Sequence, residues 1–324
     1  MIDRQQKYLA LSGGIGGAKL VLGLSHVLAP EQLSVVANTG DDFQHFGLTV
    51  CPDIDTLIYT LSGLGNKKLG WGREDESWNF MAACAELGMD TWFRLGDRDL
   101  ALHLYRTQRL AAGAKLTQIT AELCERLGIR VRIIPMSDLP APTVVFTDRG
   151  ELSFQEYFVR HRCAPEIHEI EYRGSNAAAI SPLFAQSLRD PDLRALIICP
   201  SNPFLSVQPI LSLPAVKETL RQAGKPVIVV SPIVAGEALK GPTAGIMRQL
   251  NMNCDVRAIA EYYADIADGI IIDSKDSDYT DAITATGIRV HSCNIVMQTL
   301  EDRIDLAREA LRFSEQLRTG RHDR

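Results

Sequence analysis

Short apolar runs alternate along the chain with segments whose apolar residues recur at helical spacing. The apolar runs predict strands, and the amphipathic segments between them predict helices. Strands that alternate with helices are typical of an α/β fold, in which helices cover both faces of a mostly parallel sheet. The strands that we expect cover residues 8–11, 33–37, 91–95, 130–134, 196–199, 226–230, 269–272 and 289–291.

The alternation is interrupted between residues 137 and 176. A hairpin is expected over 144–153, and the spacing of Ser153 and Glu156 predicts a capping box at the start of a helix. Residues 167–172 alternate between apolar and polar, as a half-exposed strand does. We therefore predict a small inserted α+β layer or lid at about 137–176. Because no Gly/Ser-rich linker separates it, we expect residues 1–324 to form one α/β domain.

A glycine-rich stretch follows the first predicted strand. It reads Ser12-Gly-Gly-Ile-Gly-Gly-Ala-Lys19, and we expect a bare turn here, followed by a helix from Ala18. Backbone N–H groups without neighbouring side chains, next to a helix N-terminus, favour a bound phosphate. The alternative is a tight turn that only saves space. The spacing matches neither the dinucleotide fingerprint nor the Walker loop, which argues against an ordinary dinucleotide-dependent oxidoreductase. The candidate phosphate-binding glycines are Gly13, Gly14, Gly16 and Gly17.

Four carboxylates lie within fifteen residues of one another after the second predicted strand. Carboxylate oxygens, together with substrate phosphate oxygens, are the ligands that Mg²⁺ prefers. The alternative is a solvated acidic loop with helix caps, since Asp is favoured at N-caps. These carboxylates belong to Asp41, Asp42, Asp53 and Asp55.

Two further polar loops follow predicted strands, at the edge where open α/β sheets bind ligands. The first contains Arg94, whose guanidinium suits a phosphate or a carboxylate, or pairs with Asp97 or Asp99. The second reads Pro200-Ser-Asn-Pro203, in which Ser201 and Asn202 offer hydrogen-bonding groups for a ligand or for a plain turn.

Composition narrows the class of protein. A net charge of -6 over 324 residues argues against broad binding of nucleic acid, which needs a basic surface. No apolar run approaches the roughly 20 residues of a membrane span. The seven cysteines stand singly, which indicates a reducing compartment, and we expect the protein to be cytoplasmic.

Five motifs in combination resemble the 2-phospho-L-lactate transferase family, in its bacterial type. They are the glycine stretch, Asn38-Thr-Gly-Asp-Asp42, Pro52-Asp-Ile-Asp-Thr56, Arg94-Leu-Gly-Asp-Arg-Asp99 and Pro200-Ser-Asn-Pro203. The resemblance implies a Rossmann-like enzyme of coenzyme F-420 biosynthesis. It would use Mg²⁺ to transfer a phospho-acid from its guanosine diphosphate derivative to 7,8-didemethyl-8-hydroxy-5-deazariboflavin (Fo), releasing GMP. The donor acid is left open among 2-phospho-L-lactate, phosphoenolpyruvate and 3-phosphoglycerate. A homodimer is also implied.

The resemblance also implies roles for individual residues. Asp55 and Arg94 would bind Fo and act in catalysis, with Asp55 orienting or deprotonating the ribityl hydroxyl. The glycines, with Lys19, Ser201 and Asn202, would bind the nucleotide. Asp41 or Asp42, together with Asp53, would hold the metal.

A related branch of the same superfamily provides the alternative function, that of a non-catalytic regulator that binds a nucleotide sugar. That branch shares the glycine turn and the acidic loop, but it lacks the Pro-Asp-x-Asp-Thr and Leu-Gly-Asp-Arg-Asp pair. The presence of both motifs in this chain favours the enzyme.

Overall fold

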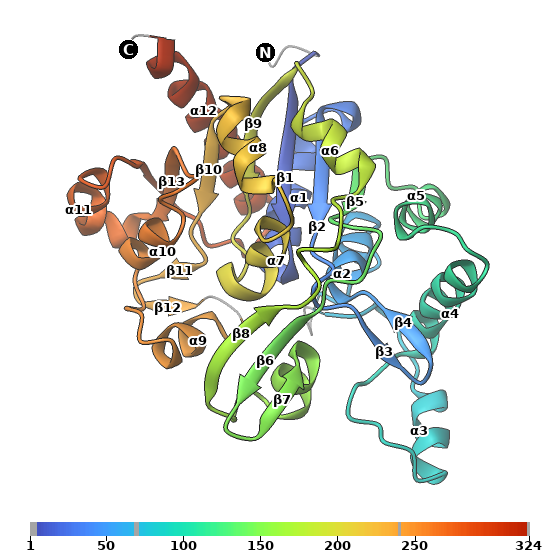
Figure 1. Cartoon of the computed structure of the whole chain (residues 1–324). Helices are drawn as coiled ribbons and strands as arrows, with labels where there is room; N and C mark the ends of the chain where they lie inside the picture. The colour runs from blue at the N-terminus through green and yellow to red at the C-terminus, as the bar shows by residue number, and fades with distance from the viewer. Residues whose placement is uncertain (1–4, 68–70, 239–240, 323–324) are drawn as a thin grey trace.

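A seven-stranded sheet forms the centre of the molecule (Figure 1). The computed structural model describes residues 5–67, 71–238 and 241–322. All neighbouring strands of this sheet are parallel, in the order β14-β13-β10-β9-β1-β2-β5. The predicted Rossmann-like α/β fold is therefore confirmed. The strands are β1 (Lys7–Ser12), β2 (Leu33–Ala37), β5 (Arg132–Pro135), β9 (Leu193–Ile198), β10 (Val227–Val230), β13 (Gly269–Asp273) and β14 (Arg289–Cys293).

The strand order changes direction at β1. The chain adds β2 and β5 on one side of β1 and then returns to add β9, β10, β13 and β14 on the other. In such sheets the ligand crevice lies beyond the carboxyl ends of the two strands at the reversal. The crevice is therefore expected next to Ser12 and Ile198, the last residues of β1 and β9.

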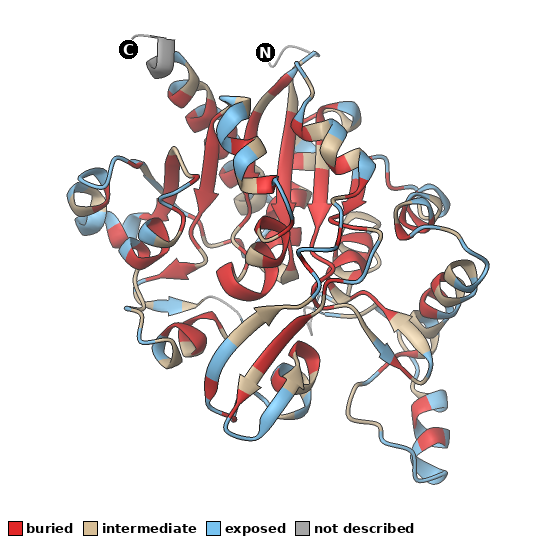
Figure 2. Cartoon of the chain, viewed as in Figure 1, coloured by how far each residue is buried: buried red, intermediate tan, exposed pale blue. Residues whose placement is uncertain are grey.

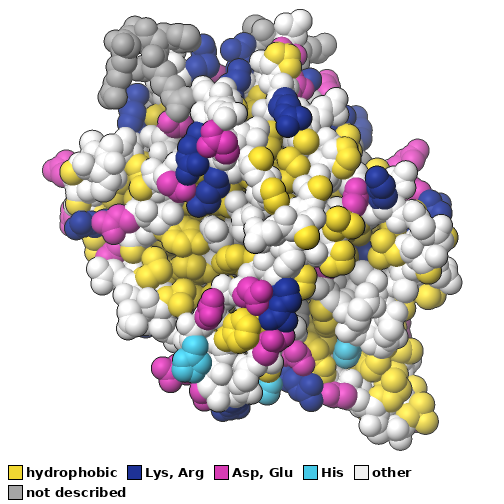
Figure 3. Space-filling model, viewed as in Figure 1, with side chains coloured by type: hydrophobic (Ala, Val, Ile, Leu, Met, Phe, Trp, Pro, Cys, Tyr) yellow, Lys and Arg dark blue, Asp and Glu magenta, His cyan; other side chains and the backbone are white. Residues whose placement is uncertain are grey.

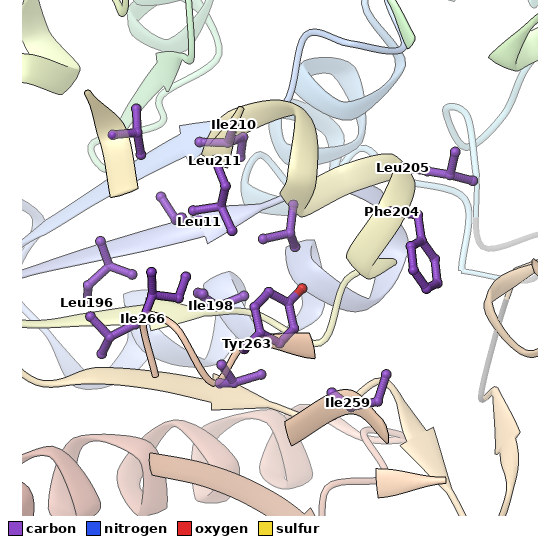
Figure 4. Close-up of a cluster of buried hydrophobic side chains, with 14 of the residues drawn as sticks. Leu11, Leu196, Ile198, Phe204, Leu205, Ile210, Leu211, Ile259, Tyr263 and Ile266 are labelled. Atoms are coloured by element: carbon purple, nitrogen blue, oxygen red, sulfur yellow. The ribbon is translucent and has the colours of Figure 1, made fainter. Parts of the chain in front are cut away.

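Two apolar cores lie on the two faces of the sheet (Figure 2). Successive side chains of a strand point to opposite faces. Leu9 and Leu11 of β1 accordingly belong to one core, and Tyr8 and Ala10 belong to the other. Figure 4 shows part of the first core, where side chains of β1 and β9 meet those of helices on that face.

Helices from distant parts of the chain cover each face. The Tyr8 face packs against α1 (Gly14–Val27), α2 (Pro52–Leu61), α4 (Asp97–Ala111), α5 (Leu116–Arg126) and α12 (Leu300–His322). The Leu9 face packs against α6 (Pro182–Leu188), η3 (Pro203–Val207), α7 (Gln208–Leu211), α8 (Val216–Ala223), α9 (Thr243–Gln249), α10 (Val256–Tyr262) and α11 (Thr280–Thr284). The other helical segments are η1 (Pro30–Gln32), α3 (Asn79–Glu86), η2 (Glu156–Arg160) and η4 (Ser274–Tyr279).

A three-stranded antiparallel sheet in the order β7-β6-β8 falls within the range predicted for the inserted layer. Its strands are β6 (Thr143–Thr147), β7 (Gly150–Ser153) and β8 (Ile167–Tyr172). The predicted capping box is present, since Ser153 N and Glu156 N each donate to the side chain of the other residue. The Thr143 N–H donates to the Gly40 carbonyl at 2.7 Å, so this sheet packs directly on the loop after β2.

The prediction of a strand at 91–95 is wrong. These residues are irregular, and their aromatic rings pack on the hairpin of β3 (Phe43–His45) and β4 (Leu48–Val50). The ring centroids of Phe93 and Phe43 lie 4.8 Å apart. An apolar run on an irregular segment over a hairpin gives the same pattern as a buried strand, so the sequence did not distinguish them. A second short hairpin consists of β11 (Ile233–Val234) and β12 (Glu237–Ala238).

On the face drawn in Figure 3, Lys and Arg side chains are interspersed with Asp and Glu side chains. Within the described ranges, none of the helices combines the length and the apolar character that crossing a membrane requires.

Candidate active site

The glycine stretch begins a helix instead of forming a turn before one. Gly13 is the extended N-cap residue of α1, and Gly14 is the first helical residue. The φ of Gly14 is +64°, a left-handed conformation that favours glycine. The expected helix start at Ala18 is therefore four residues too late, because glycine-rich sequence is a poor signal for helix.

Three of the glycines are required by close packing. A Cβ on Gly13 would lie 2.5 Å from Oδ2 of Asp53, and one on Gly17 would lie 2.5 Å from Oγ of Ser201. A Cβ on Gly16 would overlap the backbone carbonyl oxygen of Pro200. The first turn of α1 thus lies directly against the turn after β9. This packing accounts for the glycines without a ligand, and phosphate binding stays a prediction.

The turn after β9 is bonded to the start of α1. Oγ of Ser201 accepts a hydrogen bond from the Gly13 N–H at 3.2 Å. Oδ1 of Asn202 caps η3 by accepting from the Phe204 and Leu205 N–H groups. Nδ2 of Asn202 is buried without a partner among the described residues. Ser201 and Asn202 therefore lie at the end of a strand, as predicted, and this strand is at the reversal of the strand order. Asn202 keeps an unused donor there.

Asn38 joins the acidic loop to the start of α1. Its Nδ2 donates to Oδ1 of Asp41 at 2.9 Å and to Oδ2 of Asp53 at 2.8 Å. Oδ1 of Asp53 also accepts the Gly14 N–H at 2.6 Å. The structure therefore brings Asp41, Asp53 and the predicted phosphate-binding residues together beside the carboxyl ends of β1 and β2.

Burial makes the acidic cluster of Asp41, Asp42 and Asp53 costly to ionise. Burial, followed by the charge of Asp53, raises the pKa of Asp41 well above its usual value. Burial also raises the pKa of Asp42 well above its usual value, although Cys51 and Arg106 oppose this rise. Burial raises the pKa of Asp53 to about 6, against the hydrogen bonds from Asn38 and Gly14. A cation placed among these carboxylates would relieve this cost.

The cluster fits a metal ion only in part. Within the described ranges, no three His, Cys, Asp or Glu side chains converge on one point where they could hold a metal ion. Mg²⁺ in nucleotide enzymes is commonly held by one or two carboxylates and the substrate phosphates. Asp41 and Asp53, which share the Asn38 amide, suit such a site. Oδ1 of Asp42 is buried without a partner in the described part of the chain, and Asp42 lies beside Cys51.

Asp55 forms a buried ion pair that the sequence did not reveal. The two Nη atoms of Arg106 reach the two carboxylate oxygens of Asp55, with Nη1 at 3.1 Å from Oδ2. Arg106 is 0% exposed and Asp55 is 5% exposed. Burial alone would lower the pKa of Arg106, but the neighbouring Asp55 charge raises it.

Arg94 does not contact Asp55 and lies in a different environment. Its guanidinium stacks on the Trp78 ring, with Cζ 4.2 Å from the centroid, and the residue is exposed. Asp97 of the same motif has a structural role. Asp97 accepts from the Asn79 and Phe80 N–H groups, and so caps α3. The contact partner of Asp55 is therefore Arg106, and the predicted role of Arg94 in binding Fo stays a prediction.

Lys19 lies in the second turn of α1. Its Nζ donates to the carbonyl oxygen of Met297 at 2.8 Å, which ties α1 to the segment before α12. The predicted contact of Lys19 with a nucleotide therefore competes with this bond.

Arg106 and its neighbour His103 are the site residues that sequence analysis missed. Both lie on the buried face of α4. A signal existed, because His103 and Arg106 follow Asp99 at i+4 and i+7, and an amphipathic helix normally carries apolar residues on its buried face. Three ionisable residues on that face indicate a polar site.

Perturbed carboxylates at the strand reversal of a Rossmann-like sheet are expected of an enzyme more than of a purely structural protein. Comparison with known proteins identifies which enzyme family this is. The family model described as 2-phospho-L-lactate transferase CofD matches residues 9–306. The chain belongs to the 2-phospho-L-lactate transferase family, as its motifs predicted. It is thus an enzyme that transfers phospho-acid groups.

Relatives from bacteria and archaea match nearly the whole chain. A phosphoenolpyruvate transferase of Kitasatospora aureofaciens is 38% identical, and the match covers 97% of this chain and 99% of the relative. A 2-phospho-L-lactate transferase of Methanococcoides burtonii is 35% identical, over 93% of this chain and 97% of the relative.

A solved structure shares the fold. A protein of the UPF0052 family from Bacillus halodurans superposes with a TM-score of 0.62 and 14% identity, over 94% of this chain and 98% of that one. At this identity the likeness concerns the fold alone.

Proposed function

We propose that this enzyme transfers a phosphoenolpyruvyl group from its guanosine diphosphate derivative to the terminal ribityl hydroxyl of Fo. The hydroxyl oxygen attacks the phosphorus that bears the acid, the bond from this phosphorus to the bridging oxygen of GMP breaks, and GMP leaves. The product is a phosphodiester of Fo in the pathway to coenzyme F-420. The names of relatives such as that of Kitasatospora aureofaciens support phosphoenolpyruvate as the acid, and 2-phospho-L-lactate is the alternative carried by the archaeal names.

The observation that carries this proposal is the hydrogen bonding of four motifs to one another at the strand reversal. Gly13 bonds Ser201, Gly14 bonds Asp53, and Asn38 bonds both Asp53 and Asp41. The first-turn amides of α1 have no partner within the helix and favour anions. The donor diphosphate is therefore proposed to bind at this helix start, with the unused Nδ2 of Asn202 as a further donor.

Mg²⁺ is proposed to bind between Asp41, Asp53 and the donor phosphates. When bound, it would neutralise charge on the phosphoryl group that is transferred. We choose Asp41 over Asp42 because Asp41 shares the Asn38 amide with Asp53. Asp42 lies instead beside Cys51 and adds to the negative charge that favours a cation.

Asp55 is proposed to orient the ribityl hydroxyl and to accept its proton. An ionised carboxylate offers about four acceptor positions, and the Arg106 guanidinium occupies one on each oxygen. The remaining positions can accept a hydroxyl. Arg94, exposed and stacked on Trp78, is proposed to contact the Fo side of the pocket.

The test is a panel of donors. Fo, Mg²⁺ and the guanosine diphosphate derivative of each of the three acids are incubated with the enzyme, and the products are weighed by mass spectrometry. We expect a phosphorylated deazaflavin of matching mass and one equivalent of GMP, formed fastest from the phosphoenolpyruvate derivative. Binding of a nucleotide sugar without any turnover would support the regulator instead.

Asp55→Asn tests the assigned role. We expect turnover to fall about 100-fold or more, as for loss of a general base. Asp305→Asn is the matched control, because Asp305 is exposed on α12 and pairs only with Arg308 in the described contacts. Full turnover and unchanged Fo affinity in Asp55→Asn would contradict the assignment.

Homodimer formation and a cytoplasmic location also stay proposals, supported by the family resemblance and by the single cysteines. Light scattering on the purified protein measures the dimer directly, and a mass equal to one 35.7 kDa chain would contradict it.

A further inference from the structure

The Asp55 carboxylate is held by a guanidinium that solvent does not reach. Both Nη atoms of Arg106 bond it, in the forked arrangement that fixes a carboxylate in one plane. A single hydrogen bond would leave the carboxylate free to rotate about its last bond. The fork therefore determines in which direction the remaining acceptor positions of Asp55 point.

Arg106 is fixed in turn by two neighbours. Nη1 donates to the carbonyl oxygen of Thr49 in β4 at 3.2 Å and lies 3.3 Å from Nδ1 of His103. A guanidinium has only donors, so this contact is a hydrogen bond in the tautomer in which Nδ1 of His103 accepts and Nε2 carries the ring proton. That nitrogen lies 3.2 Å from Oδ2 of Asp99.

Asp99 completes the set of contacts. Its other carboxylate oxygen, Oδ1, accepts from the Tyr59 hydroxyl, and its backbone N–H donates to Glu76 at 2.8 Å. The series from Tyr59 through Asp99, His103 and Arg106 to Asp55 therefore crosses from α2 to α4 and back.

Stability does not explain this arrangement. Removing two charges from water costs several kcal/mol for each ion, and well-packed apolar residues of similar volume are often equally stable or more so. The buried face of α4 could carry leucines at these positions, as it does at Leu102. This buried pair includes Asp55, which has a proposed role in catalysis. The cost of burying the pair therefore points to a functional reason.

We propose that Arg106, held in place by His103, is the positioning residue of Asp55 and aims its free acceptor positions at the hydroxyl that attacks the donor. Arg106 itself is buried behind Asp55 and does not contact the substrates. This inference rests on the proposed function, since it concerns the orientation of the acceptor hydroxyl.

Arg106→Lys is the principal test, because lysine keeps the positive charge but cannot form the fork. We expect kcat with Fo to fall about 100-fold, the cost of a small misplacement of a reacting group. The KM of the guanosine donor should change less than about twofold, since the donor site is not altered. Arg109→Lys is the matched control. Arg109 lies on the same helix and forms a similar fork on Glu122, but on the surface, so its kcat should equal that of the wild type.

His103→Gln is the second variant, because it leaves the ion pair in place and removes the aromatic support of Arg106. A fall in its kcat of about tenfold with an unchanged donor KM supports the inference, also when Arg106→Lys does not fold. Thermal unfolding of every variant gives the folded fraction, to which each kcat is referred.

The possible outcomes separate the inference from the proposed function. If the wild type forms no product from Fo and any donor, the proposed function fails and the inference falls with it. If the wild type is active and the folded Arg106→Lys variant keeps full kcat, only the inference is overturned. Where Arg106→Lys does not fold, the folded His103→Gln variant decides in the same way. A lower melting temperature with unchanged kcat for the folded enzyme would show a structural role alone.

Discussion

Gly16→Ala tests whether close packing at the start of α1 holds the site together. The added methyl group would overlap the carbonyl oxygen of Pro200, which belongs to the backbone and cannot rotate away. The first turn of α1 must therefore move away from the turn that carries Ser201. Ala in place of Gly in a helix gains up to about 1 kcal/mol, and overpacking costs about 1–3 kcal/mol. We expect a net loss of roughly 1–2 kcal/mol in the free energy of unfolding.

Gly245→Ala is the matched control for this prediction. Gly245 lies inside α9, and a Cβ there has nothing within 4 Å. This variant should gain about 0.5–1 kcal/mol from lower backbone entropy in the unfolded chain. Urea unfolding of both variants measures the two changes, which should have opposite signs.

Activity provides the second measurement. Because Gly16 lies in the proposed diphosphate site, kcat/KM for the guanosine donor should fall at least about tenfold in Gly16→Ala, as expected when a binding group is displaced. Gly245→Ala should keep wild-type activity. If Gly16→Ala gains stability as Gly245→Ala does and keeps full activity, the packing does not constrain the site as described.

Three further predictions concern buried polar groups. Within the described residues, the Tyr263 hydroxyl has no hydrogen-bond partner in the apolar core (Figure 4), so Tyr263→Phe should raise the free energy of unfolding by about 1 kcal/mol. Tyr172→Phe loses a hydrogen bond to a backbone carbonyl oxygen and should lower the free energy of unfolding. Equal losses in urea unfolding would refute this prediction. Burial lowers the pKa of His45 below 6.5, so the unfolded chain binds the proton more readily and stability should fall as the pH drops below about 6.5. Melting curves taken across pH should show a weaker loss in His45→Gln, and an identical pH dependence would count against this prediction. Asp53, with its pKa of about 6, is ionised at pH 7.5, so Mg²⁺ should raise the melting temperature of the wild type at this pH. The rise should be smaller in Asp53→Asn, and an equal rise in both would exclude Asp53 as a ligand.

Much of the fold could be predicted from local pattern. The inner strands β13, β10, β9, β1 and β2 of the central sheet match apolar runs, because strands covered on both faces are largely apolar. The capping box of Ser153 and Glu156 was predictable as well, since both partners lie within one turn. The family was recognisable because its motifs are contiguous segments that keep their order along the chain.

The contacts within the site depended on the tertiary structure. Asp55 lies 51 residues from Arg106, and no local spacing indicates that α2 and α4 bring them together. The run at 91–95 carried enough apolar residues for a strand, but its aromatic rings pack on a hairpin formed about fifty residues earlier. The glycines were selected as phosphate-binding candidates, and that role stays a prediction. Only the fold shows that Gly16 and Gly17 admit the turn after β9. A close approach between segments more than 180 residues apart is a property of packing and leaves no pattern in either segment alone.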